Sequence, residues 1–218
     1  RFMPSENWDF NLGLFYTTTS DYPRYDRLIR KKEGQLRSAV WDYTPQEWIN
    51  GNLRITHKGS FLYDKSIFTL SYQNFKEGRR DRDFGDTILY ETKEKVNAYT
   101  SALDFIKKFG KSKLFYGLEY VYNKVNSLGK QTNILNGATS ETSPRYPDDS
   151  NWQSMAAYVS LQSKLAANLS LQLGLRYNHI LLYANYDNPF YDFPFIESDI
   201  NTGALTGSVG FNWQASEI

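Results

Sequence analysis

Apolar and polar side chains alternate strictly between Leu169 and Tyr177, where the sequence reads Leu-Ser-Leu-Gln-Leu-Gly-Leu-Arg-Tyr. A period of two is typical of a β-strand with one apolar and one polar face. The same pattern recurs about eight times along the chain. We therefore expect strands over residues 8–16, 49–56, 68–73, 96–106, 114–123, 157–161, 169–181 and 205–213.

The links between these strands are alternately long and short. The long ones are polar and span residues 17–47, 78–95, 124–151 and 182–202; the short ones span 58–64, 107–113 and 166–168. Strands of roughly ten residues suffice to cross the hydrocarbon layer when they are tilted, whereas strands of soluble proteins average about five or six. The pattern predicts an all-β fold, an antiparallel up-and-down transmembrane β-barrel whose short turns face the periplasm and whose long links are extracellular loops.

Composition agrees with a membrane protein and excludes some functions. Aromatic residues make up 17% of the 218 residues, and 17 tyrosines and five tryptophans suit membrane–water boundaries. The net charge of +1 gives no reason to expect nucleic acid as a partner. The absence of cysteine excludes disulfides and thiolate metal sites. No run is long and apolar enough for a membrane-spanning helix, and the first residues lack the apolar core of a signal peptide.

Four stretches carry a resemblance to a known family. Residues Val96–Phe105, Leu114–Tyr120 and Leu171–Tyr177 resemble barrel strands of TonB-dependent outer-membrane receptors, and Gly203–Phe211 resembles a strand of the later barrel. The haem and haemoglobin receptors are the most similar branch. The resemblance implies a bacterial outer-membrane location and transport of an iron chelate or haem. It implies outer-membrane lipid, a plug domain, TonB and a haem-carrying protein as partners, and no cofactor beyond the transported ligand.

The family's most diagnostic parts are not in this sequence. The TonB box, the plug domain and the later barrel box are missing, and the resemblance implies a barrel of 22 strands. We therefore expect residues 1–218 to be a single β-barrel segment, an incomplete part of that larger barrel. Eight strands would supply roughly a third of its wall, and the two unpaired edges would need partners.

No catalytic constellation is recognisable, so we expect no enzyme. Two histidines cannot form a three-ligand zinc site, and Asp148-Asp149 and the Asp81/Asp83 pair lack the spacing of a calcium loop. His57 is expected near the periplasmic rim and His179 on the lipid side, so neither is well placed to ligate haem. The sequence predicts no metal site.

Ligand contacts are expected from the long links instead. Arginine forks suit carboxylates, and aromatic rings can add contact area. The candidates are Arg79, Arg80, Arg82, Tyr146, Tyr186 and Tyr191. The alternative for the arginines is a salt-bridged, solvated loop, because neighbouring aspartates and glutamates nearly neutralise them. Strand parity separately predicts four lumen-facing residues: Glu119, Asn123, Gln172 and Arg176.

Two other interpretations remain open at the level of sequence. The chain could form a stand-alone eight-stranded outer-membrane barrel with an adhesive, structural or small-ligand-binding role. It could also be a soluble lipocalin-like or β-sandwich binder that buries its apolar faces around a cavity. A purified chain that stayed monomeric without detergent would favour the soluble binder.

Overall fold

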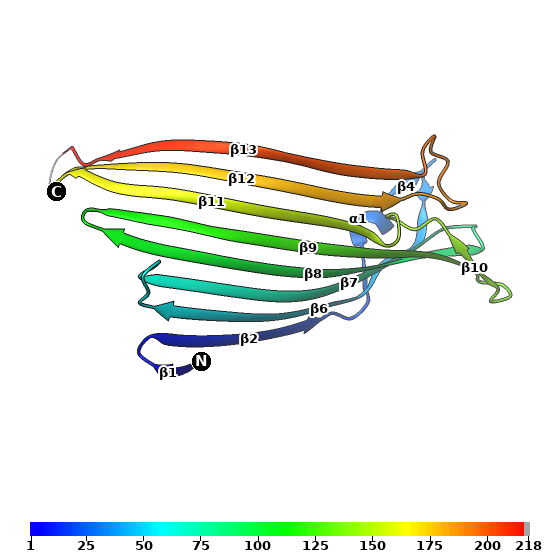
Figure 1. The fold of residues 1–218 in the computed structure, drawn as a ribbon. Coiled ribbons are helices and arrows are strands. Elements are labelled where there is room, and N and C mark those ends of the chain that lie inside the picture. The colour runs from blue at the N-terminus through cyan, green and yellow to red at the C-terminus, as the bar shows by residue number, and fades with distance from the viewer. Residues whose placement is uncertain (216–218) are drawn as a thin grey trace.

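The computed structural model describes residues 1–215 and shows one large antiparallel sheet (Figure 1). Each long strand pairs with the next long strand along the chain. The long strands are β2 (Trp8–Thr18), β6 (Ser38–Lys58), β7 (Lys65–Asp83), β8 (Ile88–Phe109), β9 (Ser112–Asn133), β11 (Ser150–Ala166), β12 (Leu169–Asn185) and β13 (Glu197–Trp213). The prediction of an all-β antiparallel fold is therefore confirmed.

The remaining elements are short. β1 (Phe2–Ser5) forms a hairpin with β2, β3 (Tyr22–Pro23) pairs with β6, and β10 (Thr139–Thr142) pairs with β9. β4 (Lys31–Lys32) and β5 (Gln35–Leu36) pair with each other, and α1 (Tyr25–Leu28) is the single helix of residues 1–215. That helix is too short to cross a membrane. Among the described residues, β1 and β13 form the two ends of the sheet and do not pair with each other, so the sheet is open.

The strands are longer than the sequence pattern predicted. β8 and β9 each contain 22 residues, and only residues 84–87 connect β7 to β8, where a long loop over 78–95 was expected. Likewise, β6 begins at Ser38 inside the expected loop 17–47. The period of two continues in these extensions, but charged side chains replace apolar ones. The high density of charged residues suggested a loop, but these residues continue the strands, and their pairing is interrupted only by bulges in β6.

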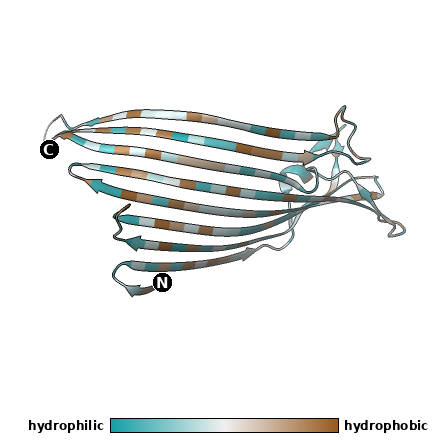
Figure 2. Ribbon diagram, viewed as in Figure 1, coloured by the Kyte–Doolittle hydropathy of each residue, from teal (hydrophilic) through white to brown (hydrophobic). Residues whose placement is uncertain are grey.

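The register collects the apolar side chains on one face. One row across five strands contains Phe10, Ile55, Phe68, Leu103 and Leu118. These side chains have no second layer to cover them: Leu118 is 58% exposed and Leu205 69%. Within residues 1–215, the only buried apolar residues are Ala156 and Ala184. The sheet has no core of its own, and the alternation of brown and teal along the strands in Figure 2 reflects this one-layer arrangement.

The two ends of the sheet differ. Tight connections join β8 to β9 and β11 to β12, and glycines with positive φ, Gly59 (84°) and Gly110 (55°), lie at this end. At the other end, three of the four connections are longer, and two of them carry α1, β4 and β10 (Figure 1); the fourth, between β7 and β8, has only residues 84–87. We call these the short-turn end and the long-loop end. The expected alternation of short and long links is therefore present except between β7 and β8, where only residues 84–87 replace the long loop that was expected.

Candidate functional site

A β-bulge in β6 brings aromatic side chains to the polar face at the long-loop end. The pairing of β6 with β7 slips between Thr44 and Glu47, so the side chains beyond the slip exchange faces. Tyr43 and Trp41 then lie opposite Arg79 and Asp81, on the polar face. Without the bulge, both rings would lie on the apolar face, away from these charged groups.

Arginine side chains cover the two rings. The Arg24 guanidinium lies 5.1 Å from the centre of the Trp41 ring and 5.9 Å from that of Tyr43, and it donates to the Tyr43 hydroxyl at 3.3 Å. Arg79 lies 5.0 Å from the Tyr43 ring and Arg27 lies 5.5 Å from Trp41. Arg24 also donates to Asp26, which raises the pKa of the arginine and lowers that of the carboxyl. All the arginines stay charged, so cation–π contacts stabilise the cluster.

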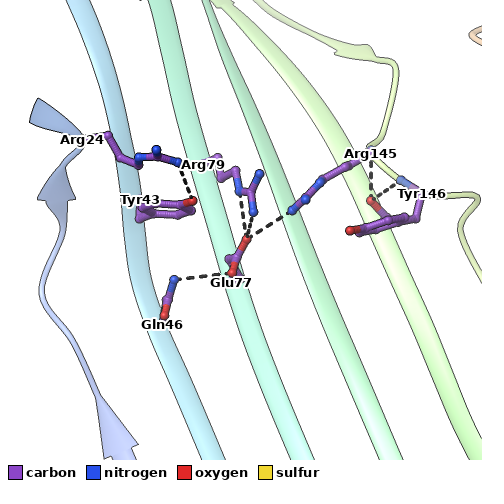
Figure 3. A network of polar contacts seen from close by, with 8 residues as sticks. Arg24, Tyr43, Gln46, Glu77, Arg79, Arg145 and Tyr146 are labelled. Carbon is purple, nitrogen blue, oxygen red and sulfur yellow. Dashed lines mark hydrogen bonds and ion pairs between the residues drawn. The ribbon is translucent and has the colours of Figure 1, made fainter. Parts of the chain in front are cut away.

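Glu77 connects this cluster to the neighbouring strands (Figure 3). Its Oε1 accepts hydrogen bonds from Arg79 at 2.9 and 2.6 Å and from Arg145 at 3.3 Å. Its Oε2 accepts a longer bond from Gln46 at 3.4 Å. Arg145 reaches Glu77 from the segment between β10 and β11, across β8. One carboxylate thus holds two guanidinium groups on the polar face.

A second carboxylate lies beside Glu77 and has no partner. Glu94 is the direct cross-strand neighbour of Glu77, and it is only 6% exposed. Neither of its carboxylate oxygens has a hydrogen-bond partner among the described residues. Burial raises the pKa of Glu94, while the nearby Arg145 and Arg79 oppose this shift. Two ionised carboxylates in register would repel each other, and the charge of Glu77 adds to the raised pKa of Glu94.

Ser127 fixes the segment that carries Arg145. The Ser127 hydroxyl accepts the backbone N–H groups of Arg145 and Tyr146, each at 3.2 Å. Asp148 accepts the Ser127 backbone N–H at 2.9 Å and the Asn126 amide at 3.1 Å. Ser127 is 1% exposed, so these bonds are shielded from water. The segment is therefore pinned to β9, with Arg145 stacked on Tyr146 at 5.0 Å.

The structure separates the arginines that were expected to act together. Arg79, Arg80 and Arg82 lie on β7 rather than in a loop, so successive side chains alternate between faces. Arg79 joins the cluster, whereas Arg80 is on the opposite face and pairs with Asp21 at 2.5 Å and with Asp42 at 3.3 Å. Arg82 shares the face of Arg80 and donates to the Asp86 carbonyl. The prediction of one arginine-rich loop is wrong in its location, because the alternation of strand residues continues through this charged stretch.

The candidate tyrosines also divide into two groups. Tyr146 lies beside Arg145 in the cluster just described. Tyr186 and Tyr191 contact each other in the link between β12 and β13, with ring centres 5.7 Å apart. Tyr186 also meets Phe193 and Phe195 edge-on, each at 5.4 Å. The Tyr191 hydroxyl donates to the Pro144 carbonyl at 3.4 Å, and burial raises the pKa of that hydroxyl.

The four residues expected to face a lumen all lie on the polar face. Glu119 forms an ion pair with Arg176, which also donates to Asn178 at 2.8 Å. Asn123 lies four residues after Glu119 on β9, and Gln172 lies four residues before Arg176 on β12, so all four side chains point to the same face. Tyr158 lies between them and donates to Asp104, with its ring over Gly117. This polar network is at the middle of the sheet, away from the arginine cluster.

The two histidines lie away from both networks. The His57 ring packs against Trp8 at a tilt of 42°, with ring centres 4.2 Å apart, and its Nδ1 lies 2.9 Å from the Tyr63 hydroxyl, at the short-turn end. His179 is beside Tyr177 on the apolar face. Within residues 1–215, no three histidine, cysteine or acidic side chains come together as metal ligands.

Sequence reasoning missed most of the cluster. Trp41, Tyr43, Glu77, Glu94 and Arg145 were all assigned to polar loops or left out. The alternation Trp-Asp-Tyr at 41–43 and Lys-Glu-Lys at 93–95 was a usable signal for strands. No sequence pattern indicated the bulge at which the side chains of β6 exchange faces.

Comparison with known proteins identifies the family. Residues 52–194 match the model of the outer membrane protein beta-barrel family. This match covers more than half of the chain, so the protein belongs to that family and is located in the bacterial outer membrane. The apolar face is accordingly the face that contacts lipid. No curated protein matches the sequence.

Several solved structures share the fold. The copper transporter OprC superposes with a TM-score of 0.70 at 13% identity, over 81% of this chain and 29% of that one. The unliganded ferric citrate transporter FecA superposes with a TM-score of 0.61 at 15% identity, over 99% of this chain and 32% of that one. The siderophore receptor PiuA from Acinetobacter baumannii superposes with a TM-score of 0.61 at 15% identity, over 96% of this chain and 38% of that one. At this identity, the similarity shows the fold alone, and the chain spans about a third of the length of these transporters and receptors, none of which is described as an enzyme.

Proposed function

We propose that this chain is part of the barrel wall of a TonB-dependent receptor that imports an iron chelate across the outer membrane. On this proposal, the polar face lines the lumen and the long-loop end is extracellular. A plug domain and TonB, neither of them in this chain, would be partners. The proposal is supported by the open sheet, by the family, and by the likeness to transporters that are roughly three times as long.

The arginine–aromatic cluster on the polar face is the observation that carries the proposal. Arg24, Arg79 and Arg145 come from three separate segments and converge on Tyr43 and Glu77. Guanidinium forks bind carboxylates and similar anions in two-point geometry. Arg145 is 36% exposed, so it remains accessible to a ligand. The cluster therefore suits an anionic chelate that enters from the long-loop end.

An iron chelate fits these residues better than haem does. Haem binding by a protein usually involves a histidine, methionine, cysteine or tyrosine ligand to the iron. His57 is at the short-turn end and His179 is on the lipid-facing side. Tyr186 and Tyr191 are packed against each other and against phenylalanines. Haem, free or on a carrier protein, is the second candidate ligand.

The other two interpretations have less support. A stand-alone eight-stranded barrel would need β13 to pair with β1 or β2, and within residues 1–215 these edges are unpaired with each other. A soluble lipocalin-like or β-sandwich binder would bury its apolar face, whereas Leu118, Leu205 and Phe211 are largely exposed. Membership of the outer-membrane family also argues against the soluble binder.

Binding of defined probes by the full-length receptor tests the proposal. Ferric citrate and haemin would be titrated against wild type and against R79Q/R145Q. Because each charge-assisted contact contributes about 1.5–3 kcal/mol, we expect the double variant to bind ferric citrate at least about tenfold more weakly. R82Q is the matched control, since Arg82 lies on the same strand but on the opposite face. Equal ferric citrate affinity in wild type and R79Q/R145Q would contradict the assignment, and selective binding of haemin would favour the second candidate.

A further inference from the structure

A row of apolar side chains crosses the polar face beside the arginine cluster. Its members pair directly with one another across β6, β7, β8 and β9, and they are Trp48, Phe75, Val96 and Val125. Phe75 is two residues from Glu77 and Val96 is two residues from Glu94, so strand parity places the row on the same face as these glutamates. We call these four side chains the apolar row.

The neighbouring rows on the same face are polar or small. Toward the long-loop end, the next row contains Glu77, Glu94 and Ser127. Toward the short-turn end, the next row contains Asn50, Gln73, Ala98 and Asn123. Each side chain of the apolar row keeps part of its surface exposed. An exposed apolar patch with a polar rim is typical of a binding site, so the apolar row is a surface that a partner can cover.

Aromatic rings form one end of this surface. The Phe15 ring on β2 lies 5.0 Å from the Trp48 ring and meets it at 66°, and Phe15 is 49% exposed. The Trp48 Nε1 donates to the Gln73 Oε1 at 3.2 Å. The polar group of the indole is thereby satisfied within the sheet, which leaves its ring for apolar or stacking contacts.

The apolar row lies directly beneath the guanidinium groups. It is two residues, or about 7 Å of strand, from Glu77, which holds Arg79 and Arg145 (Figure 3). Neighbouring strands are about 4.8 Å apart, so the row extends about 14 Å from β6 to β9. A ligand that enters from the long-loop end would meet the arginines first, and the rest of its body would lie on the apolar row. The two surfaces together therefore fit a ligand with an anionic part and an apolar part.

We propose that the imported chelate carries aryl groups beside its carboxylates, and that the apolar row binds these rings. This inference rests on the proposed function and names the class of chelate. Aryl rings stack on the faces and edges of Trp48 and Phe15, while the carboxylates stay with the guanidinium forks. A chelate without rings, such as ferric citrate, uses the arginines alone. The other candidate occupant is a segment of the plug domain, and it makes a different prediction in the experiment below.

Binding of two ferric chelates by the full-length protein, folded in detergent, tests the apolar row. The probes are ferric citrate and the ferric complex of 2,3-dihydroxybenzoate, in which the catechol oxygens hold the iron and the carboxylates stay free. Both probes offer carboxylates to the arginines, but only the second offers rings. We expect F75Q/V96T to bind the aryl chelate at least about tenfold more weakly than wild type does, because apolar contact area is lost, and to bind ferric citrate as wild type does.

A matched variant makes the same two exchanges elsewhere on the polar face. F115Q/V121T lies on β9 nearer the short-turn end and should bind both chelates as wild type does. Unchanged affinity of F75Q/V96T for the aryl chelate would overturn the proposal, as would an equal loss in the matched variant. An equal loss for both chelates would also overturn it, because that result is expected if the row packs against the plug domain.

The arginine variant separates this inference from the proposed function. R79Q/R145Q should weaken binding of both chelates, whereas F75Q/V96T should weaken only one. If R79Q/R145Q weakens both and F75Q/V96T weakens neither, the apolar row is wrongly assigned and the proposed function stands. If wild type binds neither chelate, both proposals fail. If F75Q/V96T does not fold, V96T alone decides, because threonine has nearly the shape of valine; several-fold weaker binding of the aryl chelate supports the proposal, and unchanged binding overturns it.

Discussion

At the scale of single residues, two neighbouring carboxylates have different surroundings. Glu77 and Glu94 are direct cross-strand neighbours on the polar face. Arg79 and Arg145 both donate to Glu77, at 2.6 and 3.3 Å. Glu94 is buried without partners, and burial raises its pKa. Burial and the neighbouring Glu77 both disfavour the ionised form of Glu94, as expected for carboxylates that lie side by side.

Replacement of Glu94 tests this assignment through pH. A carboxyl group whose pKa is raised in the folded state stabilises the fold below its unfolded pKa of about 4.3, and this stabilisation is lost as pH rises through the folded pKa. E94Q keeps the neutral shape at every pH. We expect E94Q and wild type to unfold alike at pH 4, and E94Q to be more stable by about 1 kcal/mol at pH 7.5.

Thermal unfolding of the full-length protein in detergent at the two pH values gives this comparison. E141Q serves as the control, because Glu141 is exposed on β10 and should show no difference at either pH. An E94Q variant that is less stable than wild type at pH 7.5 would mean that Glu94 is ionised and paired in the folded receptor.

At the scale of strands, a glycine and a tyrosine on neighbouring strands pack as one unit. Gly117 on β9 lies opposite Tyr158 on β11, and a Cβ at Gly117 would lie 2.8 Å from the tyrosine ring and 2.6 Å from the Leu103 carbonyl. The ring can therefore lie flat over the backbone and direct its hydroxyl to Asp104. Backbone atoms cannot move aside easily. A glycine is therefore needed at this position because a larger residue would clash with its neighbours, and not because the chain turns here.

Replacement of Gly117 should accordingly destabilise the sheet. We expect G117A to lose about 1–3 kcal/mol of stability, because the added methyl group displaces Tyr158 or the β8 backbone. G210A is the control, since a Cβ at Gly210 would meet only Gln172 at 3.9 Å. Urea unfolding of the full-length receptor, followed by gel mobility before and after heating, measures both. Equal midpoints for G117A and G210A would contradict the packing argument.

Strand parity also assigns the face that contacts lipid. Leu118 is 58% exposed on the apolar face of β9, and Leu135 is 77% exposed in the link between β9 and β10. An arginine at the bilayer midplane costs about 2–4 kcal/mol, and much less outside the membrane. We expect L118R to reduce the amount of folded protein in the outer membrane, and L135R to leave it unchanged. Similar yields of both variants would place β9 differently in the membrane.

The alternation of apolar and polar residues explains which strands could be predicted from the sequence. The strands near Leu118 and Leu173 were predictable because lipid on one side and polar surroundings on the other impose a period of two. Beyond the membrane no such selection for apolar residues exists, so the extensions of β7 and β8 read as charged loops. The cluster around Tyr43 depends on a bulge and on Arg145, which reaches Glu77 from a segment 68 residues away. Neither a bulge nor a contact of that range has a local sequence pattern.

At the scale of the whole molecule, stability must come from neighbours that the sheet lacks. The apolar face needs lipid, and each end of the sheet presents unpaired backbone groups. β13 bonds only to β12, and 16 of its 17 residues are exposed. In hydrocarbon, unpaired N–H and C=O groups cost several kcal/mol each, which excludes an open edge across the membrane. Additional strands, or closure of this sheet on itself, are therefore required.

Expression of residues 1–218 alone distinguishes these two possibilities. Because the sheet is open between β1 and β13, we expect the isolated chain to aggregate or to be degraded, since exposed strand edges promote association. Membrane fractions would be compared by gel mobility before and after heating, with the full-length receptor as the folded reference. On the proposal that the chain belongs to a larger barrel, co-expression of the rest of that barrel as a separate chain should restore a heat-modifiable band, because it would supply strands for both edges. A heat-modifiable monomer formed by residues 1–218 alone would instead establish a self-contained eight-stranded barrel, in which β13 closes onto β2 after insertion.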